Sequence, residues 1–224
     1  MFGGQVAAQA LRAASFTVPS DRPPHSLHAY FIRPGRPYSP MELVVERTRD
    51  GRSFATRHVT AVQADEAIFT MTTSFHVAEE GFDWQEQAPP APEPGASLDL
   101  IRYGPFLVER MSQSSEVGAF HPCWVRLEEP IDPDPVMHAC ALTYISDYVG
   151  LGRRAVLDFA MLASLDHTVW FHRPVDINQW TLFCVEPMTS FGARGLARGT
   201  FHSRDRQLIA SVVQEMLQRP APAS

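Results

Sequence analysis

The sequence predicts an α+β fold in which one helix-and-sheet unit occurs twice within 224 residues. The first observation is a repeat: residues 30–34 (YFIRP) return as residues 170–174 (WFHRP), and 171 − 31 = 140. The second is that a helix-forming run precedes a series of strand-forming runs in each half. The third is a proline-rich segment between the halves. A pattern that recurs in order and spacing indicates one structural unit used twice.

Further matches support the repeat. They are residues 43–46 with 183–186, residues 68–71 with 208–211, and residues 53–57 with 190–194, the last slipped by three residues so that Arg57 matches Arg194. Two copies of a unit in one chain form a built-in dimer, and the boundary between them can hold a site. We therefore expect an N-terminal unit (1–87), a linker (88–104) and a C-terminal unit (105–224).

The first unit is predicted to begin with a helix and to continue as antiparallel strands. Residues 6–14 are rich in alanine, a good helix former whose small side chain lets other elements pack closely. Strands are expected at residues 25–32, 41–47, 53–63 and 67–77. Asp50–Gly51 between two apolar runs is typical of a hairpin turn. We expect a curled sheet that wraps around the helix.

The second unit is predicted to have the same architecture, with strands also before its helix. Asp134–Pro135 supplies a helix N-cap followed by proline in the first helical position. The helix at residues 136–149 is apolar on nearly every face, so we expect the following sheet to bury it. The proline-rich linker is expected to be extended and unpacked.

The first unit lacks an equivalent of the strands that precede the second helix. We therefore expect its N-terminal strand to be missing. Either its sheet is one strand short, or the given start lies inside a longer gene, and we favour the second explanation.

Composition argues against several classes of function. A formal net charge of −6 is unlike the basic surface of proteins that bind nucleic acids or anionic membranes. No apolar run reaches the roughly 18 residues of a membrane span. The 3 cysteines lie in apolar runs, as reduced thiols of a cytoplasmic protein do. The chain has no P-loop, dinucleotide fingerprint, HExxH, CxxC or GxSxG motif, so we expect no metal and no cofactor.

Two polar residues stand out because their neighbours are apolar. Asp147 follows Tyr144 by almost one turn on the apolar helix, and a carboxylate is seldom buried without partners or a function. Strand alternation places Gln214 on an apolar face of residues 208–217, where its carboxamide also needs partners. Local sequence leaves structural and functional interpretations open for both.

Residues 164–168 contain two further candidates. Ser164 begins a predicted strand, and taken alone it is most simply a loop or capping residue. The neighbouring pair Asp166–His167 has the composition of a catalytic dyad. We reject that dyad because adjacent residues of a strand point to opposite faces.

Several segments together resemble the acyl-CoA thioesterase II family, also called the medium-chain or peroxisomal-type long-chain acyl-CoA thioesterases, which have a double hotdog fold. The matching segments are residues 2–6 (FGGQV), 25–31 (HSLHAYF), 49–54 (RDGRSF), 144–147 (YISD), 165–174 (LDHTVWFHRP) and 213–215 (VQE). They span almost the whole chain in the family's order.

The resemblance implies hydrolysis of an acyl-CoA by a water molecule that an aspartate, a threonine and a glutamine surround. Asp147 and Gln214 match the aspartate and the glutamine, whereas Ser164 stands in place of the threonine. Serine keeps the hydroxyl but loses the methyl group that restricts its rotamer, so we expect a modest change in rate.

Two groups of residues are candidates for binding the substrate. Backbone N–H groups of Gly3, Gly4 and Gln5, at the start of the first helix, can hold the oxyanion, although these glycines can equally serve close helix packing. The candidates for the CoA phosphates are Arg33, Arg57, Arg173 and Arg194.

Two other functions remain as alternatives. A non-catalytic acyl-CoA-binding protein of the same fold would bind the substrate without releasing thiol. A hotdog hydratase or dehydratase needs a catalytic histidine, and Asp176 and Asn178 lack the downstream histidine that would complete such a site. Pairing of exposed sheet edges would give a homo-oligomer, a dimer of double units.

Overall fold

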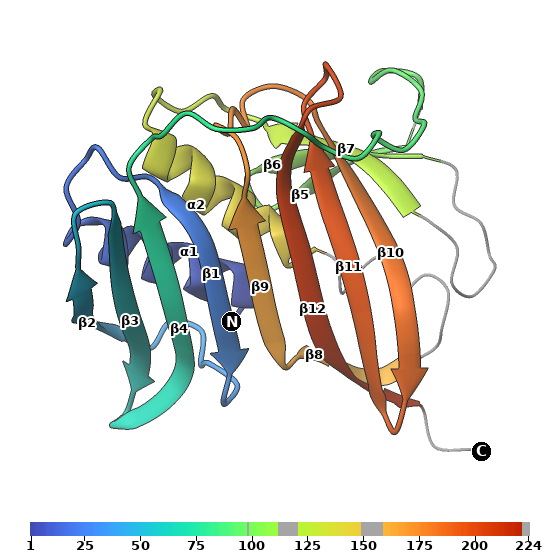
Figure 1. Ribbon diagram of the computed structural model, residues 1–224. Helices are drawn as coiled ribbons and strands as arrows, with labels where there is room; N and C mark the ends of the chain where they lie inside the picture. The colour runs from blue at the N-terminus through green and yellow to red at the C-terminus, as the bar shows by residue number, and fades with distance from the viewer. Residues whose placement is uncertain (98, 112–120, 149–158, 221–224) are drawn as a thin grey trace.

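The computed structural model describes residues 1–97, 99–111, 121–148 and 159–220. It contains a 12-stranded sheet with the order β2-β3-β4-β1-β9-β12-β11-β10-β7-β6-β5, and β8 also pairs with β12. Both helices lie on the same face of this sheet, behind it in Figure 1. The helices are α1 (Gly3–Ser15) and α2 (Pro135–Ser146).

The strands of the first half are β1 (Pro24–Phe31), β2 (Glu42–Asp50), β3 (Phe54–Gln63) and β4 (Glu66–His76). Those of the second half are β5 (Leu100–Tyr103), β6 (Phe106–Arg110), β7 (His121–Leu127), β8 (Phe159–Ser164), β9 (Asp166–Phe171), β10 (Thr181–Phe191), β11 (Arg194–His202) and β12 (Leu208–Pro220). Every strand pair is antiparallel.

The two halves join where β1 pairs with β9. His28 pairs with Thr168, and 168 − 28 = 140, so the residues at the centre of this pairing are repeat equivalents. On either side, Ser26 pairs with Trp170 and Tyr30 with Asp166. The register is therefore symmetric with respect to the repeat, as expected when a local two-fold axis relates the halves.

The repeat also governs the hairpins at a distance from this centre. Leu43 pairs with Ala61 in β2 and β3, and Phe183 pairs with Phe201 in β10 and β11, both shifted by 183 − 43 = 140.

The slipped match between Arg57 and Arg194 was wrong. Arg57 pairs with Arg47, while Ala197 pairs with Pro187, so Ala197 is the structural counterpart of Arg57. Strand register follows hairpin geometry, and the two hairpins keep one register without a slip.

The last strand of each half deviates from the repeat by one residue. The N–H of Ile32 donates to Ile68 O, and the N–H of His172 donates to Ile209 O. The offset there is 209 − 68 = 141, so Ile209 rather than Leu208 is the counterpart of Ile68. One extra residue in the second half accounts for the difference.

The predicted linker is neither unpacked nor free of regular structure. Arg206 donates to the carbonyl oxygens of Pro89 and Ala91, and the indole N–H of Trp124 donates to Pro92 O. Proline residues lack an N–H but keep their carbonyl acceptor, so this segment can still be held against the sheet. Strand β5 lies inside the predicted range. Figure 1 shows the segment running from the end of β4 across the sheet.

The helices fill the space on one face of the sheet and contact each other. Helix α1 buries Gly4, Val6, Ala7, Ala10, Leu11 and Ala14. These side chains are small, which lets α2 approach closely. None of the described helices is long and apolar enough to cross a membrane.

Candidate active site

The candidate site lies where the end of α2 meets the start of α1. Helix α2 ends at Ser146, so Asp147 is its C-cap residue rather than a residue of the helix itself. The Asp147 side chain is buried, with a residue exposure of 5%. Ser164 ends β8, and Gln214 lies in β12 with an exposure of 0%. Elements from both halves therefore converge on one carboxylate.

Hydrogen bonds fix the Asp147 carboxylate on three sides. Ser164 Oγ donates to Asp147 Oδ1 at 2.9 Å, and Gln214 Nε2 donates to the same oxygen at 2.5 Å. Gln214 Nε2 also donates to Ser164 Oγ at 2.8 Å. The N–H of Gly4 donates to Asp147 Oδ2 at 2.8 Å. A carboxylate has about four acceptor positions, so one position on Oδ2 remains for a further donor.

A pocket with a volume of about 490 Å³ opens beside this carboxylate. Asp147, Ser164 and Gly3 contribute to its wall. The rest of the wall is mainly apolar and includes Val6, Phe31, Ile68, Phe69, Met161, Leu162, Met216 and Leu217. The site therefore combines one acidic group with a lining suited to an acyl chain.

Gly3 keeps the space in front of Oδ2 open. A Cβ atom on Gly3 would lie 2.9 Å from Asp147 Oδ2 and 2.7 Å from a ring carbon of Phe31. Both distances are too short for ordinary contacts, so a side chain at this position would displace the carboxylate or the ring.

Burial raises the pKa of Asp147 above its ordinary value. The hydrogen bonds from Gln214, Ser164 and Gly4 act in the opposite direction, because they stabilise the charged form. Burial has the larger effect. The group is also at the C-terminal end of α2, whose dipole disfavours negative charge, and at the N-terminus of α1, whose dipole favours it.

Gly4 serves close packing as well as hydrogen bonding. A Cβ atom on Gly4 would lie 2.2 Å from the carbonyl oxygen of Tyr144 in the last turn of α2. The structure thus changes the prediction for Gly4, because its N–H donates to Asp147 instead of pointing to a substrate oxyanion. Gln5 is exposed and does not line the pocket. Gly3 alone of the three predicted donors borders both the pocket and Asp147.

The arginines predicted for CoA binding have different environments. Arg57 has an exposure of 1%, and it donates to Thr17, Arg49 and Asp50. Its prediction as a phosphate ligand was wrong, because this buried guanidinium joins the end of β2 to the turn that follows α1.

Only one of the other three arginines reaches the pocket. Arg33 lines it with a side chain that is 47% exposed. Arg173 pairs with Asp83, and Arg194 pairs with Glu215.

Asp166 and His167 have different partners, in agreement with the rejection of a catalytic dyad between them. Asp166 Oδ1 accepts from the N–H of Glu215. His167 Nε2 lies 2.7 Å from Ser146 Oγ, next to Asp147. Sequence reasoning missed this second contact, although an inward-facing histidine on a buried strand was a signal for it. Among the described residues, no cluster of three or more His, Cys, Asp or Glu side chains could hold a metal ion.

Comparison with known proteins identifies the family of the chain. A family model for the N-terminal domain of acyl-CoA thioesterases matches residues 1–76, and one for acyl-CoA thioesterase matches residues 109–217. Acyl-CoA thioesterase 2 of Haemophilus influenzae is 35% identical over 98% of this chain and 87% of that protein. The chain belongs to the acyl-CoA thioesterase II family. The resemblance seen in the sequence is thereby confirmed.

Other proteins are similar to this chain over most of their length. Human acyl-coenzyme A thioesterase 8 is 34% identical over 99% of this chain and 81% of that protein. The crystal structure of an acyl-CoA thioesterase II from Mycobacterium marinum is 36% identical, covers 100% of this chain and 91% of its own, and has a TM-score of 0.88. A protein with a hotdog fold from Alicyclobacillus acidocaldarius has a TM-score of 0.84 at 22% identity, covering 99% of this chain and 88% of its own, which shows the fold alone.

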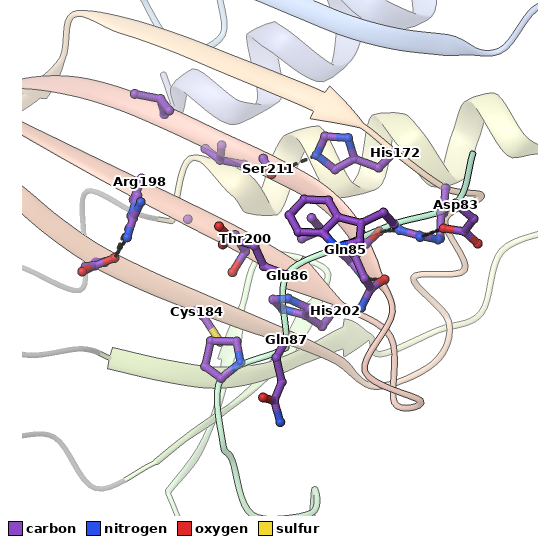
Figure 2. Close-up of a pocket in the computed structure, with 18 of the residues that line it drawn as sticks. Asp83, Gln85, Glu86, Gln87, His172, Cys184, Arg198, Thr200, His202 and Ser211 are labelled. Atoms are coloured by element: carbon purple, nitrogen blue, oxygen red, sulfur yellow. Dashed lines mark hydrogen bonds and ion pairs between the residues drawn. The ribbon is translucent and has the colours of Figure 1, made fainter. Parts of the chain in front are cut away.

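This thioesterase also has a larger cavity of about 810 Å³ under residues 79–89. Figure 2 shows the sheet side chains that line it, among them His172, His202 and Ser211. Strand alternation places Ser211 on the face opposite to Gln214. The charged groups that line this cavity are largely paired: Arg173 with Asp83 and Arg198 with Glu186. The cavity therefore has less reactive chemistry than the pocket at Asp147.

Proposed function

We propose that this chain hydrolyses acyl-CoA thioesters, with Asp147 as the general base. Asp147 takes a proton from a water molecule as the water oxygen adds to the thioester carbonyl carbon. The carbon–sulfur bond then breaks, the CoA sulfur receives the proton, and the products are a fatty acid and CoA. The observation that supports this proposal best is the buried Asp147 carboxylate beside an apolar pocket, held by Ser164 and Gln214.

The two carboxylate oxygens have different roles in this mechanism. Oδ1 accepts the hydrogen bonds from Ser164 and Gln214, which fix the orientation of the group. Oδ2 borders the space left by Gly3 and is the oxygen that takes the proton. A raised pKa makes Asp147 a stronger base than an exposed aspartate. Gln214 does not line the pocket, so its role in this mechanism is to fix Oδ1.

The start of α1 provides the positive end of a helix dipole for the oxyanion. Gly3 is the first residue of this helix, so its N–H has no acceptor within the helix. We propose that this N–H, next to the pocket, stabilises the developing negative charge. One helix turn would then serve both the base, through Gly4, and the oxyanion, through Gly3.

Thiol release tests the proposed function directly. We expect the purified protein to release CoA thiol from a series of saturated acyl-CoAs, measured with a thiol-reactive dye. Binding of these acyl-CoAs by calorimetry without thiol release would instead support a non-catalytic acyl-CoA-binding protein. Hydration of an enoyl-CoA, followed by loss of its ultraviolet absorbance and without thiol release, would support a hydratase.

Substitution of Gly3 tests the space in front of Oδ2. We expect Gly3→Ala to lower kcat by about 10²-fold, because a displacement of about 1 Å in a catalytic group can have that effect. The new Cβ would lie 2.9 Å from Oδ2. Gly81→Ala is the control, since a Cβ on Gly81 meets no atom within 4 Å. Wild-type kcat in Gly3→Ala would exclude the proposed approach of water to Oδ2.

The fold supports a finer proposal, a double hotdog with units at residues 1–87 and 105–224. The symmetric register of β1 and β9 supports a two-fold relation between these units. In the second unit β10 pairs with both β7 and β11, whereas its counterpart β2 pairs with β3 alone in the described residues. This difference supports a first unit that lacks the N-terminal strand which β7 provides in the second.

We also propose a cellular compartment and an oligomeric state. Cys123, Cys140 and Cys184 are buried and free, which supports a reducing compartment such as the cytoplasm. Strand β2 ends the described sheet and supports assembly of two or more copies through strand edges.

A further inference from the structure

One buried histidine next to the site has no part in the mechanism above. His167 lies in β9 with an exposure of 0%, and its Nε2 is 2.7 Å from Ser146 Oγ. Ser146 is the last residue of α2 and directly precedes Asp147. The partner of this imidazole is therefore the residue next to the proposed general base in the chain.

The contacts of Ser146 determine the direction of this hydrogen bond. Ser146 Oγ lies 2.8 Å from the carbonyl oxygen of Thr143, which can only accept. The single hydroxyl hydrogen therefore goes to Thr143 O, and the lone pairs of Oγ accept from the imidazole. His167 accordingly carries its proton on Nε2. Burial lowers the pKa of His167 to about 4, so the ring is neutral at physiological pH.

This chain of hydrogen bonds holds the last turn of α2. The final carbonyl groups of a helix have no partner within the helix, and helix ends fray unless they are held. The residue that follows α2 is Asp147 itself. Its backbone is in the right-handed helical region, so α2 does not end in a left-handed glycine at this position. Ser146 satisfies the Thr143 carbonyl, and His167 attaches Ser146 to β9.

A role in packing alone does not account for an imidazole at this place. His167 Nδ1 is buried and has no partner among the described residues, so the ring leaves one polar atom unsatisfied. A leucine would fill the space without that cost. What leucine lacks is the N–H that reaches Ser146.

We propose that His167 is a positioning residue that acts through Ser146 to hold the Asp147 carboxylate in its catalytic orientation. This inference depends on the proposed role of Asp147 as the base. The hydrogen bonds to Asp147 Oδ1 and Oδ2 come from β8, β12 and α1. They meet correctly only if the end of α2 is held in register with the sheet, and β9 provides that attachment.

The test compares His167→Leu with His167→Gln. We expect His167→Leu to lower kcat by about 10–10²-fold, as loss of orientation does, with KM within about threefold of wild type. Gln places an N–H near the position of Nε2, so His167→Gln should keep kcat within about threefold of wild type. Steady-state kinetics of thiol release measures both.

His202→Leu is the matched control. His202 is also buried, with 3% exposure, and the pKa of its imidazole is likewise lowered to about 4 by burial. It lines the cavity under residues 79–89, away from Asp147. We expect this substitution to leave kcat unchanged.

The proposal is overturned if His167→Leu keeps wild-type kcat or loses no more than His202→Leu. It is also overturned if His167→Gln is as impaired as His167→Leu. Should His167→Leu fail to fold, Ser146→Ala decides: about a tenfold loss in kcat at unchanged KM supports the proposal, and wild-type kcat contradicts it. Asp147→Asn is measured in parallel, because its full activity would contradict the general base itself and not the attachment of α2.

Discussion

Asp147→Asn is expected to lower kcat for acyl-CoA hydrolysis by at least about 10²-fold, since general-base assistance contributes roughly 10²–10⁴ in rate. Asparagine has almost the same shape as aspartate and can still accept from Ser164 and Gln214. It cannot take a proton from water at neutral pH. The loss should therefore appear in kcat, while circular dichroism and Tm show a folded protein.

The pH profile of the wild-type enzyme also tests Asp147 as the general base. Because burial raises the pKa of Asp147, kcat/KM should fall as the pH drops through a value above that of an ordinary aspartate. The active form is the carboxylate, so activity is present above this pKa and lost below it. The residual activity of Asp147→Asn should lack this acidic limb.

A matched control separates this effect from a general loss of negative charge. Asp83 pairs with Arg173 on the other face of the sheet, and its side chain is 80% exposed. We expect Asp83→Asn to keep the wild-type kcat and the acidic limb. Thiol release by Asp147→Asn at the wild-type rate would remove Asp147 from the mechanism.

Two of the three polar residues at the site were visible in the sequence because each contradicts its surroundings. Asp147 directly follows a helix that is largely apolar, and strand alternation alone placed Gln214 on the buried face. Both are buried and bonded to each other. Ser164, which ends β8 instead of beginning the predicted strand, gave no comparable signal, because a serine at the end of a strand is common. Only the resemblance to a family distinguished it.

Contacts between distant segments could not be predicted. Gly4 and Asp147 are separated by 143 positions, and no local pattern shows that the first N–H groups of one helix meet the end of the other. The same limit explains the error at Arg57. The match to Arg194 rested on similar residue types alone. In the structure Arg57 pairs with Arg47, and the equivalent pair in the second half is Pro187 and Ala197. The link from His167 to Ser146 is likewise a product of tertiary packing.

Gly4→Ala should impair both stability and catalysis, because Gly4 allows α1 to pack closely on α2 and also donates its N–H to Asp147. The new Cβ would lie 2.2 Å from the carbonyl oxygen of Tyr144, and this backbone atom cannot rotate away. Helix α1 must then move from α2. We expect a loss of stability of about 1–3 kcal/mol, the usual effect of overpacking, measured by urea denaturation.

The same movement takes the Gly4 N–H away from Asp147 Oδ2, so kcat should fall by about 10²-fold or more. Gly81→Ala again provides the control for adding a methyl group without a clash. The stability loss without any change in kcat would show that the close approach of the helices serves packing alone. A fall in kcat beyond that of Gly3→Ala would instead show that the hydrogen bond from α1 holds the general base, so that the first half of the chain contributes directly to a catalytic group in the second.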